Sequence, residues 1–254
     1  MEKPLIFITN DDGYRSRGIA ELIEMLRPMG ELLVIAPDST RSGYSNAITM
    51  EVPVIYSLVH QEEGLTIYKC TGSPTDCAKL AFYITDRQPD FLFSGINHGS
   101  NAAINVIYSG TMGAVFEGCV RDIPSVGFSL CNQSADADFS QCRPFFEKIA
   151  RKVIENGLPH NVCLNVNAPM GQPLGVRVCR QADGYWEEEF KLGTSPAGKT
   201  YGWMTGYFVN REPEKRDTDI YAIDNGYISI VPTSVDMTAH DVLLSMCSDY
   251  EAIR

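Results

Sequence analysis

Short apolar runs alternate with amphipathic stretches through the first two thirds of the chain. The run at 5–8 contains only bulky or β-branched residues without polar alternation, as in strands buried on both faces of a parallel sheet. Further strands are predicted at 32–35, 91–93, 125–130 and 162–166, the last of which is expected to close the sheet. Between the strands, apolar residues recur at helical spacing, as at Ile19, Leu22, Ile23 and Leu26. The pattern predicts an α/β fold around a mostly parallel sheet.

Later parts of the chain extend this pattern and then break it. Further helices are predicted at 114–119, about 139–156 and 238–246. Another helix is predicted after the turn at 71–76, with Thr75 or Asp76 as its N-cap. From about Gly175 the alternation ends, and Tyr, Trp, Gly and charged clusters indicate β-hairpins that need a partner surface. Residues 227–231 return to the texture of a buried strand. We therefore predict one domain over 1–254, with a hairpin-rich extension at 175–226 that mediates oligomer contacts.

The strand at 5–8 ends directly against Asn10, Asp11, Asp12 and Gly13. In open α/β sheets, ligands bind beyond the carboxyl ends of the strands, so these side chains should face a crevice. Two adjacent carboxylates repel each other, which raises the pKa of one of them unless a cation holds them together. The pair therefore indicates a divalent metal. The alternative is that one Asp caps the following helix while the other is solvated.

Three more polar segments are expected at the same edge of the sheet, each after a strand. The loop at 39–44 contains Arg41 and Ser42, which could reach a phosphate or a metal, although a plain surface loop fits equally well. The segment 95–101 holds small residues and amides, which let the backbone approach a ligand closely. The turn at 108–113 precedes a helix, so its N–H groups and hydroxyls suit a phosphate; ordinary N-capping is the alternative.

Composition excludes several classes of function. The 254 residues are 44% hydrophobic and 21% charged, as in an ordinary globular protein with one sizeable core. The net charge of −11 is poorly suited to a nucleic-acid duplex, because such binding depends on neutralising phosphates. No stretch approaches the ~20 apolar residues of a membrane span, and the N-terminus runs into a strand instead of a signal peptide. We therefore expect no membrane partner and a cytoplasmic location.

Motifs of common catalytic sites are absent from the sequence. It contains no nucleotide-binding glycine loop, no serine-hydrolase elbow and no H-E-x-x-H zinc motif. What remains is four segments rich in oxygen and amide ligands, which select hard cations such as Mg²⁺ or Mn²⁺. Such a site suits phosphoester hydrolysis, in which the metal neutralises phosphate charge and lowers the pKa of an attacking water. His98 lies in one of these segments, as a proton donor or as a solvated loop residue.

An ordered series of motifs resembles that of the survival protein SurE family. It comprises residues 8–13, 36–38, 41–43, 72–77, 94–97 and 109–111, and continues to 226–230 and 236–240. Any one motif is weak, whereas the ordered set covers essentially the whole chain. The family consists of divalent-metal-dependent 5′/3′-nucleotidases with a Rossmann-like core. The resemblance therefore implies a Rossmann-like three-layer α/β/α fold that acts on nucleoside monophosphates, and a homodimer or homotetramer assembled through the C-terminal hairpin extension.

The resemblance also implies roles for individual residues. One divalent ion per subunit, Mg²⁺ or Mn²⁺, would be held by Asp11, Asp12, the hydroxyl of Ser42 and the amide oxygen of Asn97. Asn10 would join the two carboxylates in the catalytic set and would also contact the phosphate of the substrate. The phosphate of the substrate would be bound by Asn101, Ser109, Gly110 and Thr111.

Two positions depart from or vary within the family pattern. Ser100 stands where the family commonly has proline, which leaves the placement of Asn101 less constrained. Tyr108 stands where family members have histidine or tyrosine, so a general-acid histidine is not available there.

The leading hypothesis is a phosphohydrolase of nucleoside 5′-monophosphates, with the 3′ position left open, in which a metal-activated water attacks phosphorus. One alternative is a broader hydrolase of small phosphoesters or polyphosphate, because nothing in the sequence specifies the base. Another is a metal-linked nucleotide-binding regulator without turnover. Phosphate release across a substrate panel separates the three.

Overall fold

The computed structural model describes residues 3–250, so the outer ends of the predicted domain, 1–2 and 251–254, lie outside the described residues. The main sheet consists of β1 (Leu5–Thr9), β2 (Glu31–Pro37), β3 (Tyr56–Glu62), β4 (Leu65–Cys70), β5 (Phe91–His98), β6 (Ser125–Leu130), β7 (Val162–Ala168), β8 (Gly175–Val178) and β13 (Tyr227–Ser234). The helical elements are α1 (Arg17–Leu26), α2 (Pro74–Ala81), the 3₁₀ helix η1 (Ala103–Ile107), α3 (Gly110–Val120), α4 (Arg143–Asn156), α5 (Asp219–Asp224) and α6 (His240–Tyr250).

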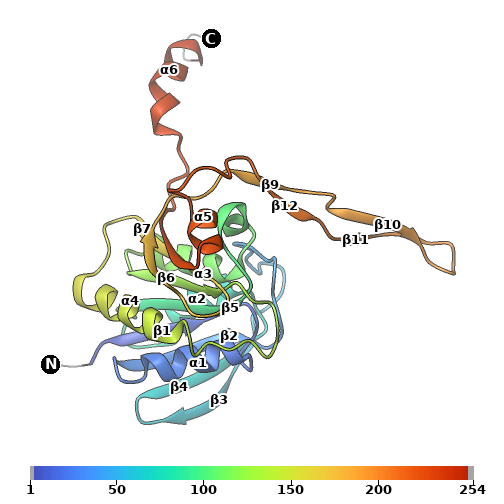
Figure 1. Ribbon diagram of the computed structural model, residues 1–254. Coiled ribbons are helices and arrows are strands. Elements are labelled where there is room, and N and C mark those ends of the chain that lie inside the picture. Colours follow the sequence, from blue (N-terminus) through green and yellow to red (C-terminus); the bar gives the residue numbers. More distant parts are fainter. Residues whose placement is uncertain (1–2, 251–254) are drawn as a thin grey trace.

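The nine strands form one sheet in the order β3-β4-β2-β1-β5-β6-β7-β13-β8 (Figure 1). Neighbours run parallel except in two pairs, β3 with β4 and β13 with β7. β1 therefore lies near the middle of the sheet, between β2 and β5. The predicted mostly parallel α/β fold is confirmed, and the predicted strand at 162–166 corresponds to β7.

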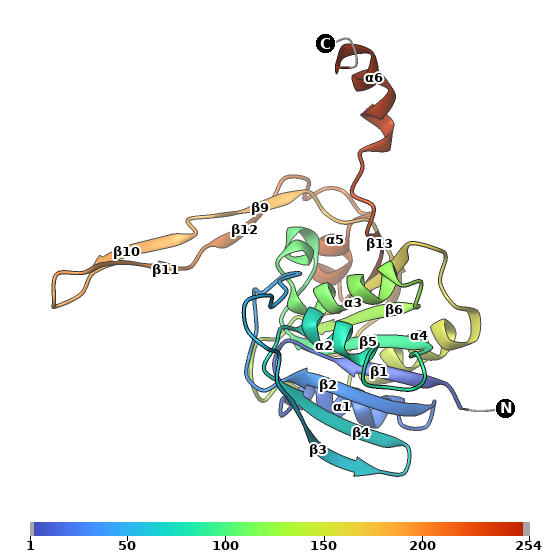
Figure 2. The same cartoon turned by 180° about the vertical axis from the view of Figure 1, so that it is seen from behind.

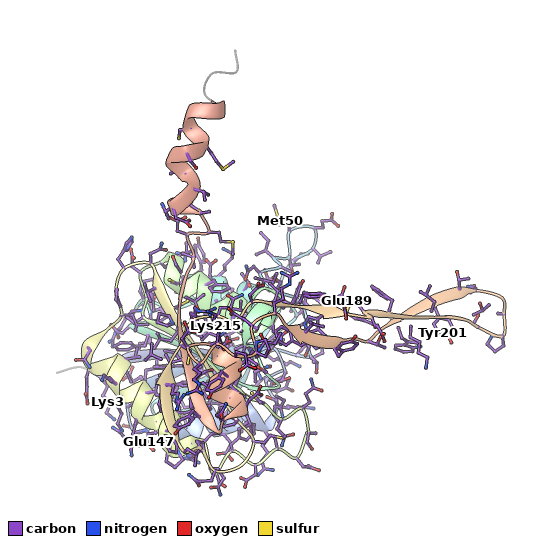
Figure 3. All side chains as sticks on the ribbon, turned by 45° about the horizontal axis from the view of Figure 1, so that its top comes forward. Lys3, Met50, Glu147, Glu189, Tyr201 and Lys215 are labelled. Atoms are coloured by element: carbon purple, nitrogen blue, oxygen red, sulfur yellow. The ribbon has the colours of Figure 1, made fainter. Side chains whose placement is uncertain are left out.

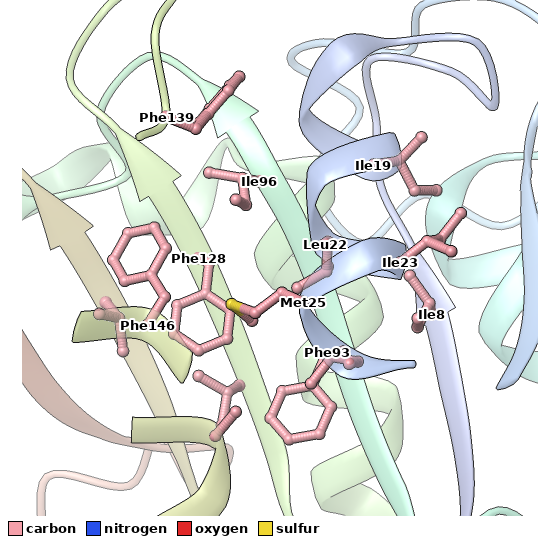
Figure 4. Packing of buried hydrophobic residues seen from close by; sticks show 14 of the residues in the cluster. Ile8, Ile19, Leu22, Ile23, Met25, Phe93, Ile96, Phe128, Phe139 and Phe146 are labelled. Atoms are coloured by element: carbon pink, nitrogen blue, oxygen red, sulfur yellow. The ribbon is translucent and has the colours of Figure 1, made fainter. Parts of the chain in front are cut away.

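Helices cover both faces of the sheet, which makes three layers. On β1, Ile6 and Ile8 belong to the hydrophobic cluster under α1 and α4, while Phe7 belongs to the cluster under α2 and α3. Figure 4 shows the first cluster, in which the residues of α1 pack against Phe93 and Phe128. Because both faces of β1 are buried, its sequence shows no polar alternation.

Several predicted boundaries were wrong. β7 does not close the sheet, because β13 pairs antiparallel with it and β8 pairs with β13. Ser73, not Thr75 or Asp76, caps α2, since its hydroxyl accepts the Asp76 N–H at 3.0 Å. The segment expected as a loop at 95–101 begins inside β5, which runs to His98. The turn at 108–113 follows η1 instead of a strand, and α3 already begins at Gly110.

A long two-stranded arm projects from the body (Figures 1 and 2). It is built from the antiparallel pairs β9 (Gly184–Glu187) with β12 (Tyr207–Asn210) and β10 (Phe190–Thr194) with β11 (Thr200–Met204). The predicted extension at 175–226 also contains β8 and α5, which pack on the main sheet and not on the arm. Figure 3 shows the side chains of Glu189 and Tyr201 along the arm, clear of the body.

Apolar side chains along the arm face solvent. Leu192 is 81% exposed, and Trp203 is 69% exposed. Helix α6 also extends away from the body (Figures 1 and 2). Among the described residues, no helix has the length and apolar character needed to cross a membrane.

Candidate metal and phosphate site

The polar segments predicted from the sequence meet around one cavity of about 420 Å³ beyond the carboxyl ends of β1 and β5. Six of the predicted site residues line it: Asp11, Asp12, Ser42, Asn97, Asn101 and Ser109. The other three predicted residues, Asn10, Gly110 and Thr111, lie behind this surface and support it. The short turns after β1 and β5 bring these side chains together, since the two strands are neighbours in the sheet.

Asp11 is a buried carboxylate, 3% exposed, beneath the start of α3. Its Oδ1 accepts a hydrogen bond of 2.6 Å from the Thr111 hydroxyl. Burial raises the pKa of Asp11 to about 6; the Thr111 hydrogen bond opposes this shift, and the neighbouring charge of Asp12 adds to it. No cationic side chain in the described part of the chain offsets the shift. At neutral pH the site therefore holds a buried negative charge that a cation would stabilise.

Asp12 lies beside Asp11 and is held from β5. Its Oδ2 accepts the backbone N–H of His98 at 3.1 Å. Burial raises the pKa of Asp12, against the lowering effect of His98. The imidazole of His98 is itself fixed, because its Nδ1 lies 2.9 Å from the Ser134 carbonyl oxygen and its ring packs edge-on against Phe139. His98 thus holds the Asp12 carboxylate through its backbone N–H.

The start of α3 approaches Asp11 very closely. A Cβ atom at Gly110 would lie 2.9 Å from the Asp11 Cβ, so only glycine permits this contact. Ser109 is the N-cap, since its hydroxyl accepts the Met112 N–H at 3.0 Å, as the capping alternative proposed. The same hydroxyl can still donate toward the cavity. The N-terminus of α3 therefore lies next to the two carboxylates, and the backbone N–H of Thr111 is directed at Asp11.

Asn97 and Asn101 come from the end of β5 and the turn that follows. The Asn97 amide nitrogen donates to the Gly99 carbonyl at 2.9 Å, which leaves its amide oxygen for another partner. The Asn101 amide nitrogen donates to the Ser129 hydroxyl at 2.8 Å. Both side chains are therefore held in place before any ligand binds.

Two residues that the sequence analysis missed fix the backbone of Asn101. The Asn167 amide oxygen accepts the Asn101 N–H, and the Asn165 amide nitrogen donates to the Asn101 carbonyl, both at 2.8 Å. A further bond of 2.9 Å joins the two amides of β7. Asn101 is thus constrained without the proline that the family commonly has at position 100. The signal in the sequence was a pair of amides at alternate positions of a buried strand.

Asn10 and Arg41 hold the turns that carry the metal candidates. Asn10 is buried, and its amide bonds the backbone of Gly13 and the hydroxyl of Ser16, which caps α1. The Arg41 N–H donates to the Asp11 carbonyl at 2.7 Å, while its guanidinium donates to the Thr71 carbonyl. Arg41 thereby ties the loop that carries Ser42 to the backbone of Asp11.

The donor set fits a hard cation. Among the described residues, no group of three or more His, Cys, Asp or Glu side chains could hold a metal. The cavity instead offers two carboxylates with a neutral hydroxyl and an amide oxygen. Mg²⁺ and Mn²⁺ bind oxygen ligands of this kind, and Mg²⁺ usually keeps several waters beside one or two carboxylates.

Comparisons with known proteins identify the family of the chain. The model of the survival protein SurE family matches residues 6–188. Proteins named 5′-nucleotidase SurE from Phocaeicola vulgatus and Bacteroides thetaiotaomicron are each 52% identical to the chain, over 95% and 98% of both sequences respectively. The crystal structure of the SurE protein from Aquifex aeolicus shares the fold with a TM-score of 0.82 and 31% identity, over 96% of this chain and 99% of that one. The chain therefore belongs to the SurE family.

Proposed function

We propose that this protein hydrolyses nucleoside 5′-monophosphates and releases phosphate, with a divalent metal at Asp11 and Asp12. The observation that carries the proposal is the buried carboxylate of Asp11 beside the half-buried carboxylate of Asp12, next to the N-terminus of α3 in an open cavity. Among the described residues, no cationic side chain offsets the raised pKa of Asp11. The relatives named 5′-nucleotidase support the choice of substrate.

Each group around the cavity has a distinct chemical task. Asp11, Asp12, the Ser42 hydroxyl and the Asn97 oxygen would hold one Mg²⁺ or Mn²⁺ ion per subunit. When bound, such an ion neutralises phosphate charge and activates water as a nucleophile. Thr111 keeps the Asp11 carboxylate oriented through their 2.6 Å hydrogen bond.

The phosphate would lie between Asn101 and the start of α3. The Ser109 hydroxyl and the Asn101 amide can donate to its oxygens, and the positive end of the α3 dipole favours its charge. Because these donors are fixed by the fold, they stabilise the charge that develops in the transition state without reorganising. Asn10 contributes by holding the turn that carries both carboxylates.

The exposed apolar side chains of the arm support assembly into a homodimer or homotetramer. The cytoplasmic location stays a prediction from the sequence.

Phosphate release tests the proposal directly. The wild-type protein is incubated with nucleoside 5′- and 3′-monophosphates, p-nitrophenyl phosphate and polyphosphate, with Mn²⁺ or Mg²⁺, and with EDTA as the control. We expect release from 5′-monophosphates that EDTA abolishes, and no turnover by Asp11→Asn. Near-normal turnover by that variant would contradict the metal assignment. Absence of release from every substrate would favour the regulator without turnover, and equal rates on all substrates would favour the broader hydrolase.

A further inference from the structure

The cavity contains side chains that neither the metal nor the phosphate requires. Besides the residues described above, it is lined by two aromatic side chains, Tyr108 and Trp186, and by the amides of Asn105 and Gln133. Apart from its phosphate and sugar, a nucleotide presents a flat ring with polar edges. Aromatic faces and side-chain amides are the groups with which proteins bind such a ring.

Trp186 reaches the cavity from the base of the arm, and its orientation is fixed. It lies on β9, where it pairs with Phe208 of β12. Its indole Nε1–H donates to the Asn105 Oδ1 at 2.8 Å, which ties the arm to η1. The Asn105 amide nitrogen in turn lies 3.4 Å from the Ser100 carbonyl. Trp186 is half-buried, so its ring is held by the protein while part of it remains open to the cavity.

Tyr108 and Asn105 lie close to the phosphate residues along the chain. Tyr108 directly precedes Ser109 and is 50% exposed, and Asn105 follows Asn101 by four residues. The short 3₁₀ helix η1 between Asn101 and Ser109 therefore connects the phosphate site to the aromatic side chains. Both groups of side chains line the same cavity of about 420 Å³.

We propose that Trp186 and Tyr108 form a stacking subsite for the nucleobase, which makes nucleoside monophosphates better substrates than base-free sugar phosphates. Stacking accepts every base because each has a π-face, so both purine and pyrimidine nucleotides are substrates. Gln133 and Asn105 offer donors and acceptors to the edge of the base. This inference rests on the proposed function, and it makes the base of the arm part of the substrate site.

Kinetics with matched substrates test the subsite. Adenosine 5′-monophosphate and ribose 5-phosphate carry the same reacting group, and only the first has a base. For Trp186→Ala we expect kcat/KM on the nucleotide to fall by about 5- to 150-fold, chiefly through KM, because stacking is worth about 1–3 kcal/mol per base. On ribose 5-phosphate, kcat/KM should be unchanged. Trp203→Ala, on the distal arm, is the control and should behave as wild type on both.

The outcomes separate this inference from the proposed function. If wild type releases phosphate from neither compound, the proposed function fails. If wild type is active and Trp186→Ala loses both activities equally, or loses neither, the stacking subsite is refuted.

Fluorescence gives a second test that does not depend on turnover. The chain has two tryptophans, so Trp203→Phe leaves Trp186 as the only indole. We expect nucleoside monophosphates, with EDTA present to prevent turnover, to quench Trp186, and ribose 5-phosphate to leave it unchanged. The matched control is Trp186→Phe, whose remaining Trp203 should not respond to either. An equal response to both ligands, or no response to the nucleotide, would overturn the proposal.

Discussion

Replacing Asp11 with Asn should stabilise the metal-free protein while abolishing its response to metal. Burial raises the pKa of Asp11 from 3.8 to about 6, so the folded state holds this proton more tightly than the unfolded state does. The resulting stabilisation is complete below pH 3.8 and is lost as the pH rises through 6. A rise in pKa from 3.8 to about 6 means that the ionised carboxylate of Asp11 lowers the free energy of unfolding by about 3 kcal/mol at pH 7.

Asparagine removes this cost because it does not ionise, and its oxygen can still accept the 2.6 Å bond from Thr111. In EDTA at pH 8, the free energy of unfolding of Asp11→Asn should therefore exceed that of wild type by up to ~3 kcal/mol. For a protein of this size that is roughly 6–12 °C in Tm. As the pH falls through 6 the difference should shrink, to roughly 1 kcal/mol at pH 4.5, because the wild-type carboxyl becomes protonated in the folded state.

Thermal unfolding followed by circular dichroism checks each step, at pH 4.5 and pH 8, with EDTA and then with Mn²⁺. Wild type should gain stability with Mn²⁺, because a ligand that binds only the folded state raises Tm, and the variant should not. A variant that is less stable than wild type in EDTA at pH 8 would refute the electrostatic reasoning. A Mn²⁺ shift equal to that of wild type would refute the role of Asp11 as a ligand.

Three further predictions concern residues outside the proposed metal ligands. Asp76 is also a buried acid, but hydrogen bonds from Thr49 and the α2 N-terminus outweigh burial and lower its pKa. Asp76→Asn should therefore lower the free energy of unfolding by about 1–2 kcal/mol at pH 7 in the same melts. This loss should shrink as the pH falls below 4, where the wild-type carboxylate becomes protonated. Gly110→Ala places a methyl 2.9 Å from the Asp11 Cβ, so it should cost about 1–3 kcal/mol and weaken the Mn²⁺-induced rise in Tm. Leu192→Lys, on the arm, should shift the protein toward monomer in light scattering; wild type that is already monomeric would contradict the proposed assembly.

The pattern of apolar runs was enough to predict the class of fold and to place the candidate site residues at one edge of the sheet. Strand β1 carries consecutive buried residues because it is covered on both faces, and an uninterrupted run of apolar residues in the sequence is enough to indicate this. The carboxylates directly after it had to lie at the carboxyl edge of the sheet, where neighbouring strands also end. The motifs around Ser42, Asn97 and Ser109 were visible for the same reason, since each is a short segment of unusual composition.

Contacts between distant segments were decided only by the tertiary structure. The sequence did not show that β13 inserts between β7 and β8, because strand order depends on packing across more than 50 residues of chain. Nor did it show that Asn165 and Asn167 fix the backbone of Asn101, or that Trp186 bonds Asn105 beside the cavity. Local patterns record whether a residue is buried and what shape its backbone takes. Which distant partner satisfies a polar group is set by the whole fold, since that partner comes into reach only when the chain is packed.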